Sequence, residues 1–378
     1  MATTKVLLGF SWNKSKDGDV RQVKDKINIS DSVLKVAKKE LREDKTTREQ
    51  ALEQMRDWLK KNYDVENIRT DDSFLLRFLR NKKFSVPMAQ QQLLKYLNMR
   101  KVMGHLSYNL DFLSPGVKGL IDNGYIMMSP IRDKYGRRTI LYFACKFVIL
   151  IVDDDASSLF LFVAGLNGVQ YTQVDQVQAH YITYETLMES QEEQILGIVH
   201  IGDFAGASTS HVSLWKNPVE FLKILKWGEQ SMPLRHKEIH LYNIATMLKY
   251  VIDAAKQIIT SKMRDRVHVS FTVLIALSFA SFHFHYTQTY VTEDDLKKKI
   301  VNVDVLPKEM GGKVPMAEML ELFKMELATS RNTLLALDQM KILNDSGIIG
   351  RRNVDKNNNS VSGKSEQVIG SFRKLEID

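Results

Sequence analysis

The sequence has a single cysteine, Cys145, among its 378 residues. One cysteine excludes an internal disulfide framework and suits a reducing compartment. No stretch reaches the roughly 20 continuous apolar residues that a membrane-spanning helix needs. The start, MATTKVLLGFSWNKSKDG, has too short an apolar run for a secretory signal peptide. These absences predict a cytoplasmic protein whose only contact with membranes is peripheral.

Signatures of nucleic-acid binding and of catalysis are also missing. There is no zinc-ligand spacing, aromatic–glycine signature or basic recognition helix, so we expect no nucleic-acid partner. The tail motif SGKS resembles a phosphate-binding loop but has Asn358 where that loop needs glycine. GASTS, which contains Ser208, lacks the second glycine of a hydrolase nucleophile elbow. We therefore expect no enzyme activity, cofactor or metal, and a lipid hydrolase acting through Ser208 is the third-ranked alternative.

What the chain does contain is typical of a globular protein with an anionic partner. Apolar residues make up 44% of the sequence and charged residues 26%, which argues against wholesale disorder. The 53 basic residues exceed the 45 acidic ones, and the net charge is +8. Such an excess suits a membrane surface, a nucleic acid or a phosphate, and does not choose among them.

The periodicity of apolar residues changes along the sequence. Helical periodicity dominates the region before residue 110, and alternating strands and helices follow, which predicts a largely parallel sheet covered by helices. The expected fold class is α/β, preceded by an all-α bundle. The expected parts are an extension (1–30), a helical domain (31–110), an α/β domain (118–315), a helix (316–345) and a disordered tail (346–378).

Two local patterns make specific predictions within the helical region. In TTREQALEQ, Thr47 and Gln50 are spaced as a capping box at a helix start. In DDSFLLRFLRNKKF, the periodicity predicts that the apolar residues face inward and that Arg77 and Arg80 face outward.

A second amphipathic segment is harder to place. NPVEFLKILKWGEQSMPLRHK would form a helix with an apolar side that includes Phe221 and Trp227, followed directly by Arg235 and Lys237. On periodicity alone, such an apolar side most often packs in the core.

Four features in one order carry a family resemblance. They are DDSFLLRFLRNKKF, the helix TQVDQVQAHYITYETL, the amphipathic helix with its exit PLRHKEIHLYN, and KMRDRVHV followed by LPKEMGG. Over about residues 45–325 the chain resembles the CRAL-TRIO (Sec14-like) lipid-binding family, in the branch of tocopherol-transfer and retinaldehyde-binding proteins. It departs from the family in having Met310 where a tyrosine is usual.

The resemblance implies an apolar cavity that holds one hydrophobic molecule beneath a mobile lid helix. It places Phe221, Leu222 and Leu225 on the lid. The implied pocket residues are Val177, His180, Tyr184, Ile198, Gly202, Ile224, Trp227, Leu234 and Ile239. His180 and Tyr184 stand where the tocopherol-binding relative has small hydroxyl residues. Both side chains are larger and can donate hydrogen bonds to a ligand hydroxyl, aldehyde or ester. The alternative is that both face solvent.

The resemblance also implies a basic surface that docks on phosphoinositide headgroups. The matched positions are Arg77, Arg235, Lys237, Lys262 and Arg266, all of which are basic here. Some of these positions exchange arginine for lysine relative to the family. Arginine binds phosphate through a planar fork and lysine through a point charge, so the preferred headgroup can differ.

Two apolar stretches interrupt the family pattern. They run from Val148 to Tyr171 and from Phe271 to Val291, where family members have short loops. We hypothesise that they are translated intron sequence or gene-model errors, and the alternative is that they are genuine insertions that contact membranes.

The leading functional hypothesis is a monomeric carrier of tocopherol, a retinoid or a similar lipid. It would exchange that ligand at endosomal or other phosphoinositide-bearing membranes. The runner-up is a lipid-sensing adaptor that recruits a protein partner without transferring cargo. The sequence does not choose the ligand or the headgroup.

Overall fold

The computed structural model describes residues 29–144, 146–151, 158–163, 171–205, 218–245, 249–272 and 303–349. The chain divides into two units, residues 1–346 and residues 347–378. The predicted extension and disordered tail lie almost wholly outside the described residues.

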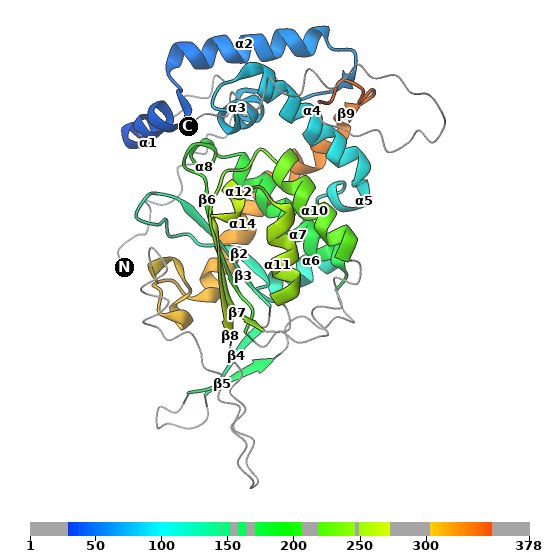
Figure 1. The fold of residues 1–378 in the computed structure, drawn as a ribbon. Helices are drawn as coiled ribbons and strands as arrows, with labels where there is room; N and C mark the ends of the chain where they lie inside the picture. Colours follow the sequence, from blue (N-terminus) through cyan, green and yellow to red (C-terminus); the bar gives the residue numbers. More distant parts are fainter. Residues whose placement is uncertain are drawn as a thin grey trace, which may run out of the picture. The chain divides into compact units, whose positions relative to one another are not determined.

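Helices make up most of the N-terminal region (Figure 1). They are α1 (Asp31–Val36), the π-helical turn η1 (Ala37–Leu41), α2 (Lys45–Lys61), α3 (Asp72–Asn81), α4 (Val86–Val102) and α5 (Gly104–Ser107). The capping-box prediction at Thr47 was wrong. The N-cap of α2 is Asp44, whose carboxylate accepts from the Thr47 backbone amide at 2.8 Å. Asp is as strong an N-cap as Thr, and it lies three residues nearer the chain start.

The α/β region is built on a five-stranded sheet in the order β2-β3-β6-β7-β8. Its strands are β2 (Ile126–Met128), β3 (Arg138–Phe143), β6 (Ile198–Asp203), β7 (His236–Ala245) and β8 (Val267–Thr272). Only the β2–β3 pair is antiparallel, and the other pairs are parallel. This mostly parallel sheet, preceded by helices, confirms the expected fold class.

Helices connect these strands. The connecting helices are α7 (Gln173–Met188), α8 (Gln191–Leu196), α10 (Pro218–Ser231), α11 (Lys249–Ile258) and α12 (Ser261–Arg264), and α6 (Pro115–Asp122) leads into β2. Figure 1 shows α7, α10 and α11 on the same side of the sheet. The polar and apolar pattern from Thr172 to Leu196 predicts one long helix, but the structure has two helices that meet at Glu189 and Ser190.

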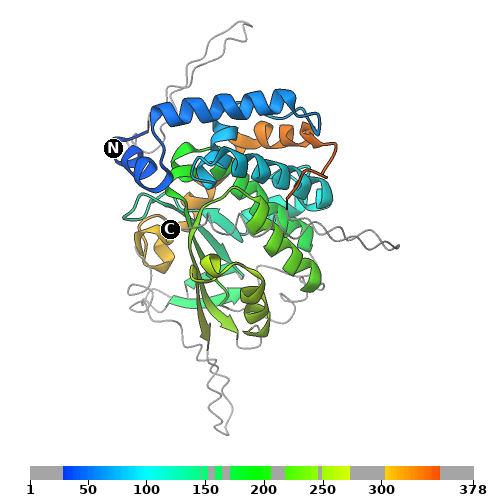
Figure 2. The same cartoon turned by 45° about the horizontal axis from the view of Figure 1, so that its top comes forward.

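The end of the folded chain returns to the N-terminal bundle. After the 3-10 turns η4 (Val303–Val305) and η5 (Lys308–Met310), α14 (Met316–Ala336) packs against α7 and β2. The turn η6 (Leu337–Gln339) leads into β9 (Lys341–Ile342), which pairs antiparallel with β1 (Val65–Glu66). The bundle is therefore not purely α-helical, and Figure 2 shows the orange C-terminal segment among its helices.

The first of the two intruding stretches contributes to a separate hairpin. Strands β4 (Lys146–Ile151) and β5 (Ser158–Val163) pair with each other, antiparallel, in a two-stranded sheet of their own. Most of the second stretch lies outside the described residues. The intron hypothesis for both stretches stays a prediction.

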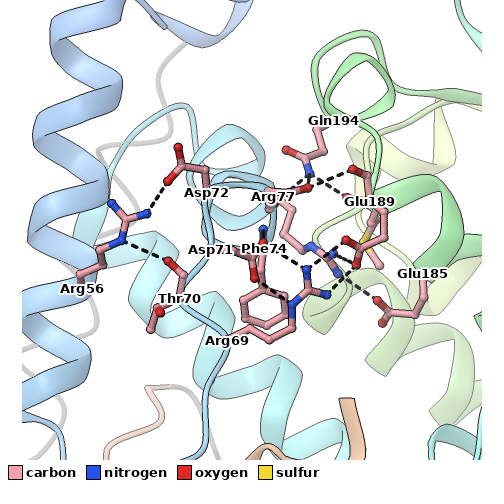
Figure 3. A network of polar contacts seen from close by, with 12 residues as sticks. Arg56, Arg69, Thr70, Asp71, Asp72, Phe74, Arg77, Glu185, Glu189 and Gln194 are labelled. Carbon is pink, nitrogen blue, oxygen red and sulfur yellow. Dashed lines mark hydrogen bonds and ion pairs between the residues drawn. The ribbon is translucent and has the colours of Figure 1, made fainter. Parts of the chain in front are cut away.

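A buried network of charges joins the bundle to α7 (Figure 3). We call Arg69, Arg77, Glu185 and Glu189 the arginine network. Arg77 donates to Glu185 at 2.9 Å and to Glu189 at 2.6 Å. Arg69 donates to both carboxylate oxygens of Glu189, at 2.7 and 3.0 Å. Although burial alone would raise the pKa of Glu189, Arg77 and Arg69 lower it to about 2. Arg77 and Glu185 are almost completely buried in this network, and Arg69 and Glu189 are partly exposed at its edge.

The prediction that Arg77 and Arg80 face outward was wrong. Both are buried, at 0% and 1% exposure. Arg80 binds both oxygens of Glu43 at 2.8 and 2.9 Å and also donates to Gln194 at 2.8 Å. Each arginine has acceptors on another segment, and those acceptors make its burial possible.

We expect Arg77→Met to destabilise the protein by about 3–5 kcal/mol, because it leaves Glu185 buried without its cationic partner. Urea unfolding at neutral pH measures this loss. Lys60→Ala is the control, since Lys60 forms an exposed ion pair with Asp57 and its removal should change stability little. Equal unfolding midpoints for wild type and Arg77→Met would contradict the assigned role.

Candidate functional site

A group of aromatic and imidazole side chains gathers between α7 and the sheet. The histidine–tyrosine cluster comprises Tyr125, Tyr142, His180, Tyr184, His200 and His236. Tyr125 Oη lies 3.0 Å from His180 Nε2, and His200 Nε2 lies 2.8 Å from His236 Nδ1. The ring of Tyr184 bridges these two pairs, with centroids 5.9 Å from His180 and 5.8 Å from His200.

Strand register and helix spacing place the predicted pocket residues around this cluster. Ile198 and Gly202 alternate with Val199 and Ile201 along β6, so they share the face of His200. Ile239 is the β7 register partner of His200 and points the same way. Val177 lies three residues before His180 on α7, which puts both on one helix face. His180 and Tyr184 therefore face the sheet and not solvent.

The position of the Tyr142 ring requires a glycine at residue 202. A Cβ at this position would come within 2.1 Å of the Tyr142 ring, which lies beside Gly202 across the β3–β6 pair. A larger residue would push that ring out of the histidine–tyrosine cluster.

The cluster is electrically neutral at physiological pH. Burial lowers the pKa of His180 from 6.5 to about 4. Burial and the nearby Arg266 lower the pKa of His236 to about 4, and burial lowers that of His200 well below its ordinary value. Burial also raises the pKa of Tyr125, Tyr142 and Tyr184, which keeps their phenols protonated.

The predicted lid corresponds to α10. Ile224 is buried, and Phe221, Leu222, Leu225 and Trp227 are partly buried. The helix packs against α4 of the bundle and against α11. Two hydrogen bonds hold the C-terminal end of α10. Gln92 donates to the Ser231 carbonyl at 3.0 Å, and the Thr260 amide donates to the Glu229 carboxylate at 3.1 Å. Leu234, which is buried, follows directly.

Three of the predicted phosphoinositide-binding residues meet at one place. Arg235, Lys237 and Arg266 form what we call the basic cluster, at the starts of β7 and β8. Arg235 and Lys237 share one oxygen of Glu40, from the π-helical turn η1, at 2.8 and 2.7 Å. Arg266 donates to the backbone carbonyl of His236.

One carboxylate does not neutralise three cations. Burial lowers the pKa of Arg235 and of Arg266, and Glu40 only partly opposes this effect. Burial and repulsion from Arg235 and Arg266 likewise lower the pKa of Lys237. The net charge of +2 in this partly buried group would be stabilised by an anion.

Glycine at position 197 allows the start of β6 to lie close to Arg235. Gly197, with φ of +76°, ends α8, and a Cβ there would lie 2.5 Å from the Arg235 carbonyl oxygen. That carbonyl instead accepts from the Ile198 amide at 2.9 Å. Any side chain at this position would separate β6 from the residue that begins the basic cluster.

The other two predicted headgroup ligands lie elsewhere. Arg77 is buried in the arginine network, so it offers no charge to a headgroup in this structure. Lys262 is an exposed residue of α12, four positions before Arg266.

Several site residues were not foreseen from the sequence. Glu40 lies 195 residues from Arg235 and carries no local signal of its role. His200 could have been found, because in a strand it shares a face with the predicted pocket residues Ile198 and Gly202.

Other kinds of site do not emerge from the described residues. In those ranges, no group of three or more potential ligands could hold a metal ion, and no helix is long and apolar enough to cross a bilayer. A surface hollow of about 250 Å³ is lined by Arg56, Leu59, Lys60, Val65, Asn67, Ile68 and Thr70. It includes none of the predicted pocket residues. Ser208, the residue of the hydrolase alternative, lies outside the described ranges.

Comparison with known proteins identifies the domain that contains these clusters. Residues 124–275 match the model of the family described as CRAL/TRIO domain. These residues form a CRAL/TRIO domain. This range contains every member of the histidine–tyrosine cluster and of the basic cluster.

Relatives extend the similarity beyond the CRAL/TRIO domain. Clavesin-1 of Xenopus laevis is 27% identical over 292 residues, covering 77% of this chain and 76% of that protein. Alpha-tocopherol transfer protein-like of Mus musculus is 26% identical over 285 residues, covering 75% and 71%. Among solved structures, the crystal structure of Sfh5 matches with 13% identity and a TM-score of 0.39, covering 60% of this chain and 81% of that one.

The resemblance to CRAL-TRIO proteins that the sequence indicated is therefore confirmed for residues 124–275, and the relatives include alpha-tocopherol transfer protein-like proteins. The expectation that the chain is not an enzyme agrees with its matches to a lipid-binding domain and to transfer-protein-like relatives.

We expect the neutral histidines to make stability depend on pH. Between pH 6.5 and about 4, the unfolded chain protonates His180 while the folded CRAL/TRIO domain does not, so stability falls as the pH falls. His180→Phe should reduce the loss between pH 7 and pH 5 by up to about 2 kcal/mol. Urea unfolding at both pH values measures it.

The exposed His105 of α5 provides the control, as His105→Phe. If His180→Phe and wild type lose the same stability between these pH values, His180 is not held neutral by burial.

Proposed function

We propose that the protein carries a small hydrophobic lipid beneath α10 and exchanges it at phosphoinositide-containing membranes. Tocopherol, retinoids and similar lipids are the candidate cargoes. One observation carries the proposal: the short segment from Ser231 to Lys237 both ends α10 and supplies two charges of the basic cluster. A membrane that binds these charges acts directly on the end of the covering helix.

The architecture of α10 supports its role as a cover. Its apolar side contributes about 1.5–3 kcal/mol for each large side chain that is removed from water, which favours the closed state in solution. Contacts with lipid tails can replace that contribution at a membrane surface. Because Gln92 and Thr260 hold its C-terminal end, we expect opening to pivot there.

The basic cluster supports docking on phosphorylated lipid. Its two arginines present planar forks that match phosphate oxygens, and Lys237 adds a point charge. Each basic residue near an anionic membrane surface contributes about 1 kcal/mol to binding. The exposed Lys262 on α12 adds a further charge on the same connection as Arg266.

A vesicle-to-vesicle transfer assay with a fluorescent tocopherol or retinoid analogue tests this function. We expect phosphoinositide in the acceptor vesicles to accelerate transfer, and Arg235→Gln/Lys237→Gln to abolish the acceleration while ligand uptake is retained. Lys60→Gln/Lys61→Gln is the charge-matched control on α2, and it should behave as wild type. Binding to vesicles without transfer would instead indicate the adaptor, and no uptake of either analogue would contradict the carrier.

Glu40 should restrain headgroup binding, because its carboxylate occupies the place of an anion between Arg235 and Lys237. We expect Glu40→Gln to strengthen binding to phosphoinositide vesicles by about fivefold, in line with one added unit of net positive charge. Sedimentation with vesicles at physiological salt measures the change. Glu53→Gln, an exposed change on α2, controls for net charge alone. An equal gain from both variants would remove Glu40 from the site.

A further inference from the structure

The first helical segment of the structure has an apolar side and a basic side. The apolar side is buried in one cluster with α8, formed by Val33, Ala37, Leu41, Ile195 and Leu196. The other side is exposed and carries four basic residues, Lys35, Lys38, Lys39 and Arg42. Among the described residues, none of these four forms an ion pair. The segment made of α1 and η1 therefore turns positive charge toward solvent.

This basic side adjoins the proposed headgroup site. Residues 31–42 contain two acids, Asp31 and Glu40, and Glu40 is engaged by Arg235 and Lys237 at 2.8 and 2.7 Å. That contact holds η1 directly against the basic cluster. The exposed cations of the segment therefore add to the positive potential around the cluster, and they enlarge the area that attracts an anionic partner.

The turn between β2 and β3 exposes an aromatic ring. Tyr135 is 59% exposed, and its ring centre lies 5.2 Å from Lys134 Nζ and 4.8 Å from Arg137 Cζ. The Asp133 carboxylate accepts from the backbone amides of Tyr135 and Arg137 at 2.8 and 2.9 Å, which fixes the tip of the turn. Because the turn is already ordered, a partner that binds the ring has little conformational entropy to remove.

Helix α8 connects this turn to the basic segment. Leu196 belongs to the apolar cluster with α1 and η1, and a Cβ at Gly136 would lie 3.3 Å from its Cδ1 atom. Arg132, at the start of the turn, donates to Glu193 of α8 at 2.7 Å. Figures 1 and 2 show the blue α1 and the teal turn before β3 on the same side of the molecule. The exposed ring and the exposed cations thus belong to one surface.

The acids around the turn are already paired with arginines. Arg137 binds Asp133 at 2.6 Å and Glu238 at 2.7 Å. Arg132 is within ion-pair distance of Glu193, which is almost completely buried. Lys134 is exposed and forms no ion pair among the described residues. The charge that remains available to a partner at this turn is therefore positive.

We infer that this surface is a second membrane contact, which binds anionic lipid of any headgroup and places the Tyr135 ring among the headgroups. We call it the auxiliary surface, and its residues are Lys35, Lys38, Lys39, Arg42, Lys134 and Tyr135. Basic residues near a bilayer attract anionic lipids, and tyrosine rings favour the interface between headgroups and tails. A fluid bilayer can supply an anion at each separate position. This inference rests on the proposed function, in which the adjoining basic cluster docks on phosphoinositide.

The two contacts should have different headgroup requirements, which vesicle sedimentation at physiological salt can separate. One set of vesicles contains phosphatidylcholine with phosphatidylserine, and the other contains phosphatidylcholine with phosphoinositide at matched charge. We expect Lys38→Gln/Lys39→Gln to weaken binding to the phosphatidylserine vesicles by about thirtyfold and to leave the preference for phosphoinositide unchanged. Arg235→Gln/Lys237→Gln should abolish that preference. Lys60→Gln/Lys61→Gln is the charge-matched control on α2 and should bind as wild type.

A fluorescent label tests the position of the aromatic ring. In a Cys145→Ser background, a nitrobenzoxadiazole group attached through Tyr135→Cys should brighten and shift to the blue on phosphatidylserine vesicles, because it leaves water. Tyr63 provides the control as Tyr63→Cys, since it is 90% exposed and lies beyond the opposite end of α2. Its label should not respond. Circular dichroism checks that each variant is folded.

The outcomes distinguish the auxiliary surface from the proposed function. Equal binding by Lys38→Gln/Lys39→Gln and the α2 control, or an equal response of the two labels, overturns the auxiliary surface while phosphoinositide docking stands. A protein that binds both kinds of vesicle equally, and loses both when Lys38 and Lys39 are changed, supports the auxiliary surface and contradicts phosphoinositide docking. Failure of the wild-type protein to bind either kind of vesicle overturns both.

Discussion

The pairing of Arg77 with Glu185 and Glu189 is the interaction on which the rest of the structure depends. It fixes α7 against the N-terminal bundle through buried charges, and Tyr96 adds a hydrogen bond to Glu185 at 2.7 Å. Helical spacing places these carboxylates on the face of α7 opposite His180. One helix thus presents its charged face to the bundle and its neutral aromatic face to the sheet.

The bundle contributes to the candidate membrane site as well as to the fold. Glu40 reaches the basic cluster from η1, and π-helical turns of this kind are often found at functional sites. Gln92 of α4 holds the end of α10. The match to the CRAL/TRIO domain covers residues 124–275, yet contacts from the preceding helices reach both the basic cluster and the covering helix.

Periodicity predicted most of the elements, because the core-facing patterns of the helices and of β6 are strong. It failed for Arg77, since hydrophobic spacing does not reveal an acid that lies 108 residues away. It failed in a different way at Glu189 and Ser190, where polar residues continue the helical pattern while the chain turns between α7 and α8. The individual pocket positions came from family resemblance, whereas the burial of His180 and its pairing with Tyr125 required coordinates.

The pairing of β1 with β9 has a consequence for the order in which the protein is made. Strand β9 and Asp338, which binds Arg100 at 2.6 Å, belong to the end of the described chain, 238 residues after that arginine. At bacterial or eukaryotic translation rates the ribosome takes roughly 10–50 s to cover that distance. The helices at the start of the chain must wait through this interval before their last partners arrive, so the nascent bundle exposes apolar surface that chaperones can bind.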